Sequence, residues 1–107
     1  MKTILDAIGN TPLIEIEGIW VKMEYLNPSG SIKARIAKYM IERAEKEGLL
    51  KAGDTIVEAS SGNTGNAMSM VAAVKGYKML VLMPTGLSLE RVAISKAFGA
   101  EVKTIGD

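Results

Sequence analysis

The segment Asn27-Pro-Ser-Gly-Ser-Ile-Lys33 places a lysine where a chain rarely puts one. Pro28 and Gly30 predict a turn, and Lys33 falls in the first turn of the helix predicted to follow. The N-terminal end of a helix carries partial positive charge and disfavours a cation, so a lysine there should lose its proton more easily. A deprotonated lysine is a nucleophile, which makes Lys33 a candidate catalytic residue. The alternative is a solvated surface lysine, which is common.

A second candidate site is the loop Ser60-Ser-Gly-Asn-Thr-Gly65, between a predicted strand and a predicted helix. Ligands of open parallel sheets bind at the carboxyl ends of the strands, where this loop is expected. Its glycines let a ligand approach the backbone, and free amides at a helix start favour an anion. The alternative is an ordinary polar turn with a serine cap. The candidate substrate-binding residues, which could hold a carboxylate or phosphate, are Ser60, Ser61, Asn63 and Thr64.

Composition narrows the chemistry further. The 107 residues contain no histidine and no cysteine, so disulfides, Cys-ligated metals and a histidine base are excluded, and no metal site is predicted. A lysine nucleophile beside an anion-binding loop then suggests Schiff-base chemistry, for which pyridoxal phosphate is the common partner. The formal net charge of +1 and the 5% aromatic content give no support for nucleic-acid binding. No membrane span or signal peptide is evident, so a cytoplasmic protein is expected.

The elements that must position these residues follow from hydrophobic periodicity and glycine stops. A helix is predicted between Ser31, as its cap, and Gly48. Continuous apolar strands and helices then alternate, which predicts the α/β class with an open parallel sheet and helices on both faces, in three layers. The predicted strands span 55–59, 78–83 and 101–105, and the predicted helices span 63–75 and 88–98.

The first part of the chain has a different pattern. A helical turn is predicted over 3–8, and two strands over 13–17 and 19–25 should form a hairpin around Glu17 and Gly18. The chain therefore divides into residues 1–27, a strand segment, and residues 28–107, a small α/β domain. We expect the strand segment to dock on a neighbouring copy or on the sheet of its own chain, because unpaired strands tend to be disordered or adhesive.

Three motifs stand out in the chain: Ile8-Gly-Asn-Thr-Pro-Leu13, Asn27-Pro-Ser-Gly-Ser-Ile-Lys33 and Glu58-Ala-Ser-Ser-Gly-Asn-Thr-Gly65. Together they resemble those of the cysteine synthases (O-acetylserine sulfhydrylases), which are pyridoxal-phosphate enzymes of the tryptophan-synthase-β-like fold. The resemblance covers essentially the whole chain, and later segments match in order and spacing. Ala34 departs from the family pattern, in which many members carry Asp or another polar residue.

The resemblance implies specific roles. Lys33 matches the lysine that forms the internal aldimine and later moves the α-proton, and Asn63 matches the asparagine that contacts the ring hydroxyl of the cofactor. Ser60, Ser61 and Thr64 match the loop that grips the carboxylate of the amino-acid substrate. Family members make L-cysteine from O-acetylserine and sulfide by β-replacement. The cofactor implied is therefore pyridoxal 5'-phosphate, and the partner is a small amino acid.

The length of the chain limits what the resemblance implies. Family members have two domains, and the chain resembles their N-terminal part, without the glycine-rich phosphate cradle. In the family, the segment matching 1–27 packs on the second domain. We therefore expect a chain with little activity alone, which forms a homodimer or associates with the missing C-terminal half. The alternatives are a non-catalytic carboxylate-binding or assembly module, and a related enzyme such as a serine/threonine dehydratase or a cystathionine β-synthase.

Overall fold

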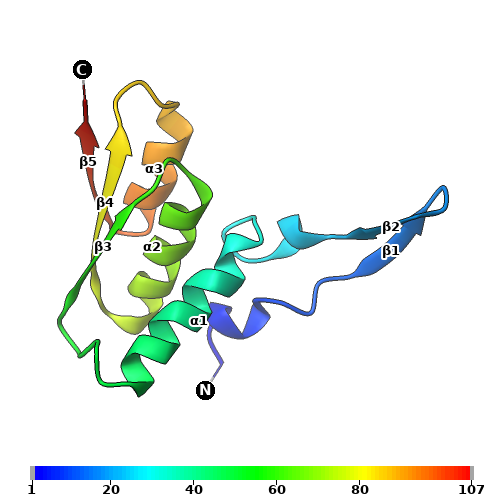
Figure 1. Cartoon of the computed structure of the whole chain (residues 1–107), viewed down its shortest axis with the longest axis horizontal. Helices are drawn as coiled ribbons and strands as arrows, with labels where there is room; N and C mark the ends of the chain where they lie inside the picture. The colour runs from blue at the N-terminus through cyan, green and yellow to red at the C-terminus, as the bar shows by residue number, and fades with distance from the viewer. Residues whose placement is uncertain (1, 107) are drawn as a thin grey trace.

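The computed structural model describes residues 2–106, which form a parallel sheet with three helices and, before it, a separate hairpin (Figure 1). The sheet contains β3 (Thr55–Ala59), β4 (Lys78–Pro84) and β5 (Glu101–Ile105), in the order β3-β4-β5. All its pairings are parallel, with Val57 opposite Leu80 and Val81 opposite Val102. The predicted open parallel sheet and its strand positions are thus confirmed, β4 being one residue longer than expected.

The connections between these strands are helical, as predicted. Helix α2 (Asn63–Lys75) has the predicted bounds and ends at Gly76, whose φ of 82° is the left-handed conformation that glycine adopts most readily. Helix α3 (Leu89–Ala97) has Ser88 at its N-cap, although the Ser88 side chain makes no capping hydrogen bond. Among residues 2–106, no helix is long and apolar enough to cross a membrane.

All three helices lie on one side of the sheet (Figure 1). Strands added in one direction through right-handed crossovers place α2 and α3 on the same face. The alternation along β4 agrees, because Met79, Val81 and Met83 are buried while Leu80 and Leu82 are only half-buried. The expected helices on the second face are not found within residues 2–106. Val57, on that second face, keeps 56% of its surface exposed. The helices therefore cover one face of the sheet only, where α2 and α3 contact the strands and α1 packs on α2.

Helix α1 (Lys33–Lys46) packs on α2 through a stripe of small and apolar residues. Ala34, Ala37 and Ile41 are buried at the three- and four-residue spacing of one helix face. The N-cap position is Ile32 and not the predicted Ser31, because the helix begins one residue later than expected. The Ser31 Oγ nevertheless accepts a hydrogen bond from the Lys33 N–H at 3.2 Å. The Ser31 hydroxyl thus contacts the first residue of α1, and a buried apolar stripe determines which side of the helix faces α2.

Glu45 ties the far end of α1 to the end of α2. Its carboxylate accepts hydrogen bonds from Lys75 Nζ at 2.8 Å and from the Tyr77 hydroxyl at 2.5 Å. The hydrogen bond from Lys75, followed by that from Tyr77, lowers the pKa of Glu45. The hydrogen bond to Glu45 in turn raises the pKa of Tyr77 to about 12. This carboxylate thus joins two helices far from Lys33.

The N-terminal segment forms the predicted hairpin from β1 (Leu13–Ile16) and β2 (Ile19–Lys22). Glu17 and Gly18 have φ of 50° and 81°, as a tight two-residue hairpin turn requires. The helical turn predicted before it is the 3-10 helix η1 (Ile4–Ala7). β2 ends earlier than predicted, because the chain turns into the 3-10 helix η2 (Glu24–Leu26).

The hairpin projects away from the parallel sheet (Figure 1). Docking on the sheet of its own chain, one of two expected arrangements, is therefore not found. Ile19 and Trp20 keep 67% and 63% of their surface exposed. Such large apolar side chains in a short two-stranded ribbon form a surface suited to a partner.

Candidate functional site

The two candidate sites lie at the same end of the helical layer. Helices α1 and α2 pack against each other, and Figure 1 shows that they run in the same general direction, so that their N-terminal ends lie together. Lys33 is the first residue of α1 and Asn63 is the first residue of α2. The fold therefore brings the Lys33 turn and the loop after β3 to one edge of the molecule.

The Lys33 turn has an unusual backbone. Ser29 and Gly30 both have positive φ, at 75° and 88°, and the Gly30 N–H donates to the Asn27 carbonyl at 2.8 Å. The left-handed region costs a serine about 1–3 kcal/mol and persists only where the surroundings hold it. The Ser29 Oγ is buried and has no hydrogen-bond partner in the described part of the chain. Strain and an unpaired buried hydroxyl thus occur four residues before the candidate nucleophile.

The side chain of Lys33 is not committed to a structural contact. The residue is half-buried, and within residues 2–106 its Nζ makes no hydrogen bond or ion pair. Lys22 and Lys75, by contrast, bind oxygen acceptors of their own fold. A partly buried amine without a partner is available to react with a carbonyl group.

The Ser60 hydroxyl binds amides of its own loop, as the alternative of a serine cap predicts. Its Oγ accepts hydrogen bonds from the Gly62 N–H at 3.2 Å and the Gly65 N–H at 2.9 Å. Ser60 thus satisfies two amides at the start of α2 from a position two residues before the N-cap, Gly62. A Cβ on Gly65 would lie 3.0 Å from Val81 Cγ1 and 3.2 Å from Ser60 Cβ, so this position has no room for a side chain. The Ser60 hydroxyl proton remains available to a ligand.

The side chains of the other three polar loop residues are not used in the hydrogen bonding of the described fold. The side chains of Ser61, Asn63 and Thr64 make no hydrogen bonds within residues 2–106, and Ser61 and Asn63 are exposed. The backbone amides of Asn63 and Thr64, in the first turn of α2, have no partner within the helix. The loop therefore presents two amides, two hydroxyls and a carboxamide to a small anion.

Arg91 is a residue of this loop region that the sequence interpretation did not place. Its Nη1 donates to the Ser61 carbonyl at 3.0 Å, and its side chain lies over Gly62, where a Cβ would be 3.7 Å from Arg91 Nε. The guanidinium adds a full positive charge beside the α2 amides. The available signal was topological, since Arg91 lies in the first turn of the helix that follows the neighbouring strand, at the same sheet edge.

The donor set fits part of pyridoxal phosphate. An uncommitted lysine amine can bind the aldehyde, and Asn63 can hydrogen-bond a ring hydroxyl from the adjacent helix start. Neither residue is needed elsewhere in the described fold. The residues described here thus offer donors of the kind that the aldehyde end of the cofactor and a small anion require.

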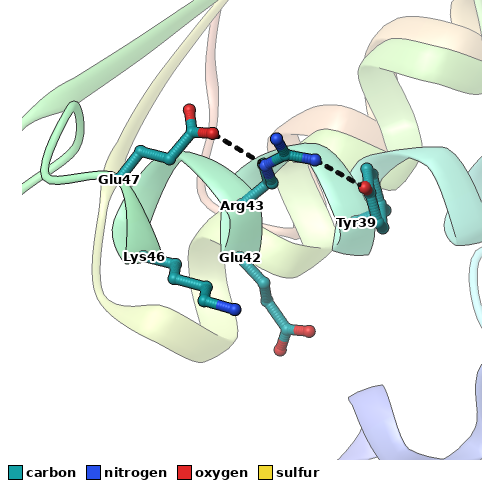
Figure 2. A pocket seen from close by; sticks show the side chains of 5 residues that line it. All are labelled: Tyr39, Glu42, Arg43, Lys46 and Glu47. Carbon is teal, nitrogen blue, oxygen red and sulfur yellow. Dashed lines mark hydrogen bonds and ion pairs between the residues drawn. The ribbon is translucent and has the colours of Figure 1, made fainter.

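A pocket on α1 has a different character (Figure 2). All five residues that line it belong to one helix, and Arg43 binds both Glu47 at 2.8 Å and the Tyr39 hydroxyl at 2.9 Å. The Arg43 and Glu47 side chains are 56% and 45% exposed, and such pairs contribute little to stability. This pocket is a solvated helix surface, and we assign it no function. Its lining residues are Tyr39, Glu42, Arg43, Lys46 and Glu47.

The cap supplied by Ser60 leads to a stability prediction. Ser60→Ala leaves the Gly62 and Gly65 amides without their acceptor and should lower the free energy of unfolding by about 0.5–2 kcal/mol. Ser61→Ala is the matched control, since the Ser61 hydroxyl makes no hydrogen bond in the described residues, and it should change stability by less than about 0.5 kcal/mol. Urea denaturation followed by circular dichroism measures both. Equal losses in the two variants would contradict the capping role.

Comparisons with known proteins agree with this geometry. The family model described as pyridoxal-phosphate dependent enzyme matches residues 4–107. The chain is 50% identical to cysteine synthase B of Salmonella typhimurium over 95% of its own length and 36% of that protein. It is 52% identical to a Flavobacterium cysteine synthase over 91% of its length and 34% of that protein. The chain thus spans about a third of the length of these curated relatives.

Solved structures give the same result. The crystal structure of O-ureido-L-serine synthase superposes with a TM-score of 0.94 at 41% identity, covering 98% of this chain and 35% of that one. A hydrogen sulfide-producing enzyme from Fusobacterium nucleatum superposes with a TM-score of 0.91 at 46% identity, covering 98% of this chain and 38% of that one. The fold of residues 2–106, including its projecting hairpin, is therefore one that occurs within larger solved proteins.

Proposed function

The chain belongs to the pyridoxal-phosphate dependent enzyme family, and we propose that it forms the lysine-bearing and carboxylate-binding part of a cysteine synthase. The resemblance to cysteine synthases and the implied cofactor are confirmed by the family match and the curated relatives. The proposed reaction replaces the acetoxy group of O-acetylserine with sulfide, in the cytoplasm. One observation carries the proposal: the uncommitted Lys33 amine and the anion-binding start of α2 share one edge of the fold.

Each residue then has a defined task. Pyridoxal phosphate, when bound, acts as an electron sink for the α-carbon of the amino acid. Lys33 Nζ holds the cofactor aldehyde and afterwards moves a proton at that α-carbon. The Ser61 and Thr64 hydroxyls and the first amides of α2 hold the substrate carboxylate, while the Ser60 hydroxyl donates from the cap. Asn63 orients the ring of the cofactor through its carboxamide.

Selective modification of Lys33 tests this function. We expect pyridoxal phosphate added to the chain and reduced with borohydride to label Lys33 in preference to the other lysines. The reason is that Lys33 is half-buried and its Nζ has no hydrogen-bond or ion-pair partner among residues 2–106. Mass spectrometry of the digested protein locates the label. Labelling spread evenly over the lysines would contradict the assignment. Binding should be weak and synthase activity low for these 107 residues by themselves, because they span about a third of the length of the curated relatives.

A second candidate function is a carboxylate-binding or assembly module without catalysis. It is favoured by the loop itself, which forms an anion site from the α2 amides and Arg91 without any contribution from the cofactor. Calorimetric titration with O-acetylserine in the absence of pyridoxal phosphate separates the two proposals. Binding that is unchanged by the cofactor, together with unselective lysine labelling, would favour the module. Related β-elimination and β-replacement reactions are distinguished by assaying sulfide against homocysteine in a longer protein that contains this sequence.

We further propose that residues 1–27 serve assembly, and that residues 28–107 form the domain that carries the site. The support is the exposed apolar surface of the hairpin, which includes Leu13, Ile19 and Trp20. Such a surface suits either a second domain or a second copy of the chain. The proposed partners are therefore the amino-acid substrate and another polypeptide that covers the hairpin.

A further inference from the structure

One carboxylate, that of Glu24, lies at the centre of a hydrogen-bond network beside the Lys33 turn. Its Oε1 accepts from Arg35 Nε at 2.6 Å and from Asn27 Nδ2 at 3.1 Å. Its Oε2 accepts from Arg35 Nη2 at 3.0 Å and from the Thr11 hydroxyl. Arg35 therefore binds both carboxylate oxygens, an arrangement that restricts direction as well as distance.

The partners of Glu24 bracket the segment that carries Lys33. Asn27 begins the turn and is buried, with 3% of its surface exposed, and Arg35 is the third residue of α1. The side chain of Asn27 also accepts from the Gly9 N–H at 2.8 Å and donates to the Glu24 carbonyl at 2.8 Å. One carboxylate thus joins the two ends of residues 27–35, with Lys33 between them.

The backbone of this segment needs such support. Ser29 and Gly30 occupy the left-handed region in succession, and the buried Ser29 Oγ has no hydrogen-bond partner in the part of the chain that the structure describes. A strained turn keeps its shape only if contacts around it determine that shape. The contacts from Glu24 to Asn27 and Arg35 flank the strained pair, two residues before it and five residues after it.

The charges agree with this arrangement. Helix α1 begins with Lys33 and Arg35 and has no acidic residue in its first turn. Glu24 supplies the missing negative charge from outside the helix, and Lys22 Nζ, which binds the Thr11 Oγ1 at 2.7 Å, adds a second cation to the network. The hydrogen bond from Arg35, followed by that from Thr11, lowers the pKa of Glu24 to about 2. Glu24 is therefore charged at every pH at which lysine chemistry can be measured.

We propose that Glu24 is a positioning residue that holds the 27–35 segment, and with it Lys33, in the geometry that the reaction requires. The inference rests on the proposed role of Lys33. Glu24 acts through Asn27 and Arg35 on the backbone of the turn. Loss of the carboxylate should release the turn without unfolding the helices, because the sheet and the α1–α2 interface do not depend on Glu24.

The chain offers a control in Glu45, a residue of α1 whose carboxylate, like that of Glu24, accepts from one cation and from at least one neutral donor as well. Its partners are Lys75 and Tyr77, at the other end of the helix. Glu24→Gln and Glu45→Gln each replace a carboxylate by an amide of the same shape. The two variants should lose a similar free energy of unfolding in urea. A difference between them in amide exchange or in labelling at Lys33 then reports the geometry of the Lys33 turn and not a general loss of stability.

Two measurements test the proposal. In Glu24→Gln we expect hydrogen exchange of the Gly30 and Lys33 amides to rise on the order of tenfold or more, since both amides donate within the released segment. The rate of pyridoxal phosphate labelling at Lys33, relative to Lys38, should fall on the order of tenfold. Glu45→Gln should leave both quantities unchanged. The exchange measurement needs no cofactor.

The outcomes separate this proposal from the proposed function. Unselective labelling of the unmodified chain would overturn the role of Lys33, whereas selective labelling that is equal in the two variants would overturn the role of Glu24. Unchanged amide exchange in Glu24→Gln would also overturn it. Should Glu24→Gln fail to fold, Arg35→Lys carries the same test, because lysine keeps the charge but cannot bind both carboxylate oxygens.

Discussion

Lys33→Ala should abolish the selective covalent incorporation of pyridoxal phosphate. With the candidate amine removed, borohydride-reduced label on the peptide containing residue 33 should vanish. Total incorporation should fall to the level given by the remaining surface lysines. The physical reason is that the Lys33 Nζ is half-buried without a hydrogen bond or ion pair within residues 2–106, so it is free to form a bond to carbon. Absorbance of the trapped cofactor and mass spectrometry of the digest measure the loss.

Lys38→Ala is the matched control for this experiment. Lys38 lies on the same helix and is also half-buried, so its removal should leave the label at residue 33 unchanged. Circular dichroism should show that both variants keep the helical fold. Selective label that persists elsewhere in Lys33→Ala, or an equal loss in the two variants, would show that Lys33 is not the attachment point.

Val81→Asp should unfold the chain, or come close to doing so. Val81 is fully buried in the central strand, and its Cγ1 would lie 3.0 Å from a Cβ on Gly65 of α2. A carboxylate there finds no partner, and an unpaired buried charge costs about 3–5 kcal/mol. A small domain is stable by about 5–15 kcal/mol in total, so this one substitution removes a large part of it. Urea denaturation followed by circular dichroism measures the change.

Val57→Asp tests the one-sided layering of the helices. Val57 lies on the neighbouring strand but keeps 56% of its surface exposed on the face without helices. The same change there should cost only about 1 kcal/mol, through the low preference of aspartate for strands. Equal destabilisation by the two substitutions would mean that the second face is covered as well, for example by another copy of the chain.

The elements with strong local signals could be predicted closely from the sequence. Helix α2 and strands β3 and β5 have the predicted bounds, because glycines such as Gly76 and Gly99 stop the helices and the strands are short and apolar. The end of β2 was predicted wrongly. Glu24 and Tyr25 continue the apolar and polar alternation of a strand, but the contacts of Glu24 with Thr11 and Arg35 draw this stretch into η2 instead. Partners 13 and 11 residues away leave no mark in a local pattern.

The candidate site, too, could be predicted from the sequence only in part. Lys33 and the loop Ser60–Gly65 were identified from residue types and turn chemistry, since helix starts, glycines and hydroxyls act locally. Their assigned roles in binding remain predictions. The contacts of Arg91 with the loop, and of Glu24 with both ends of the Lys33 turn, required the tertiary structure. Such contacts depend on how strands and helices are placed beside one another.

The sequence by itself determined the order of the elements, the motifs of the family and the residues that carry the proposed chemistry. Only the tertiary structure decided that the helices lie on one face of the sheet, that Ser60 caps α2, and that Glu24 joins Asn27 to Arg35. The physical reason is the range of the forces involved. Caps, turns and periodicity act over a few residues, whereas layering and hydrogen-bond networks arise from groups that become neighbours only when the chain has folded.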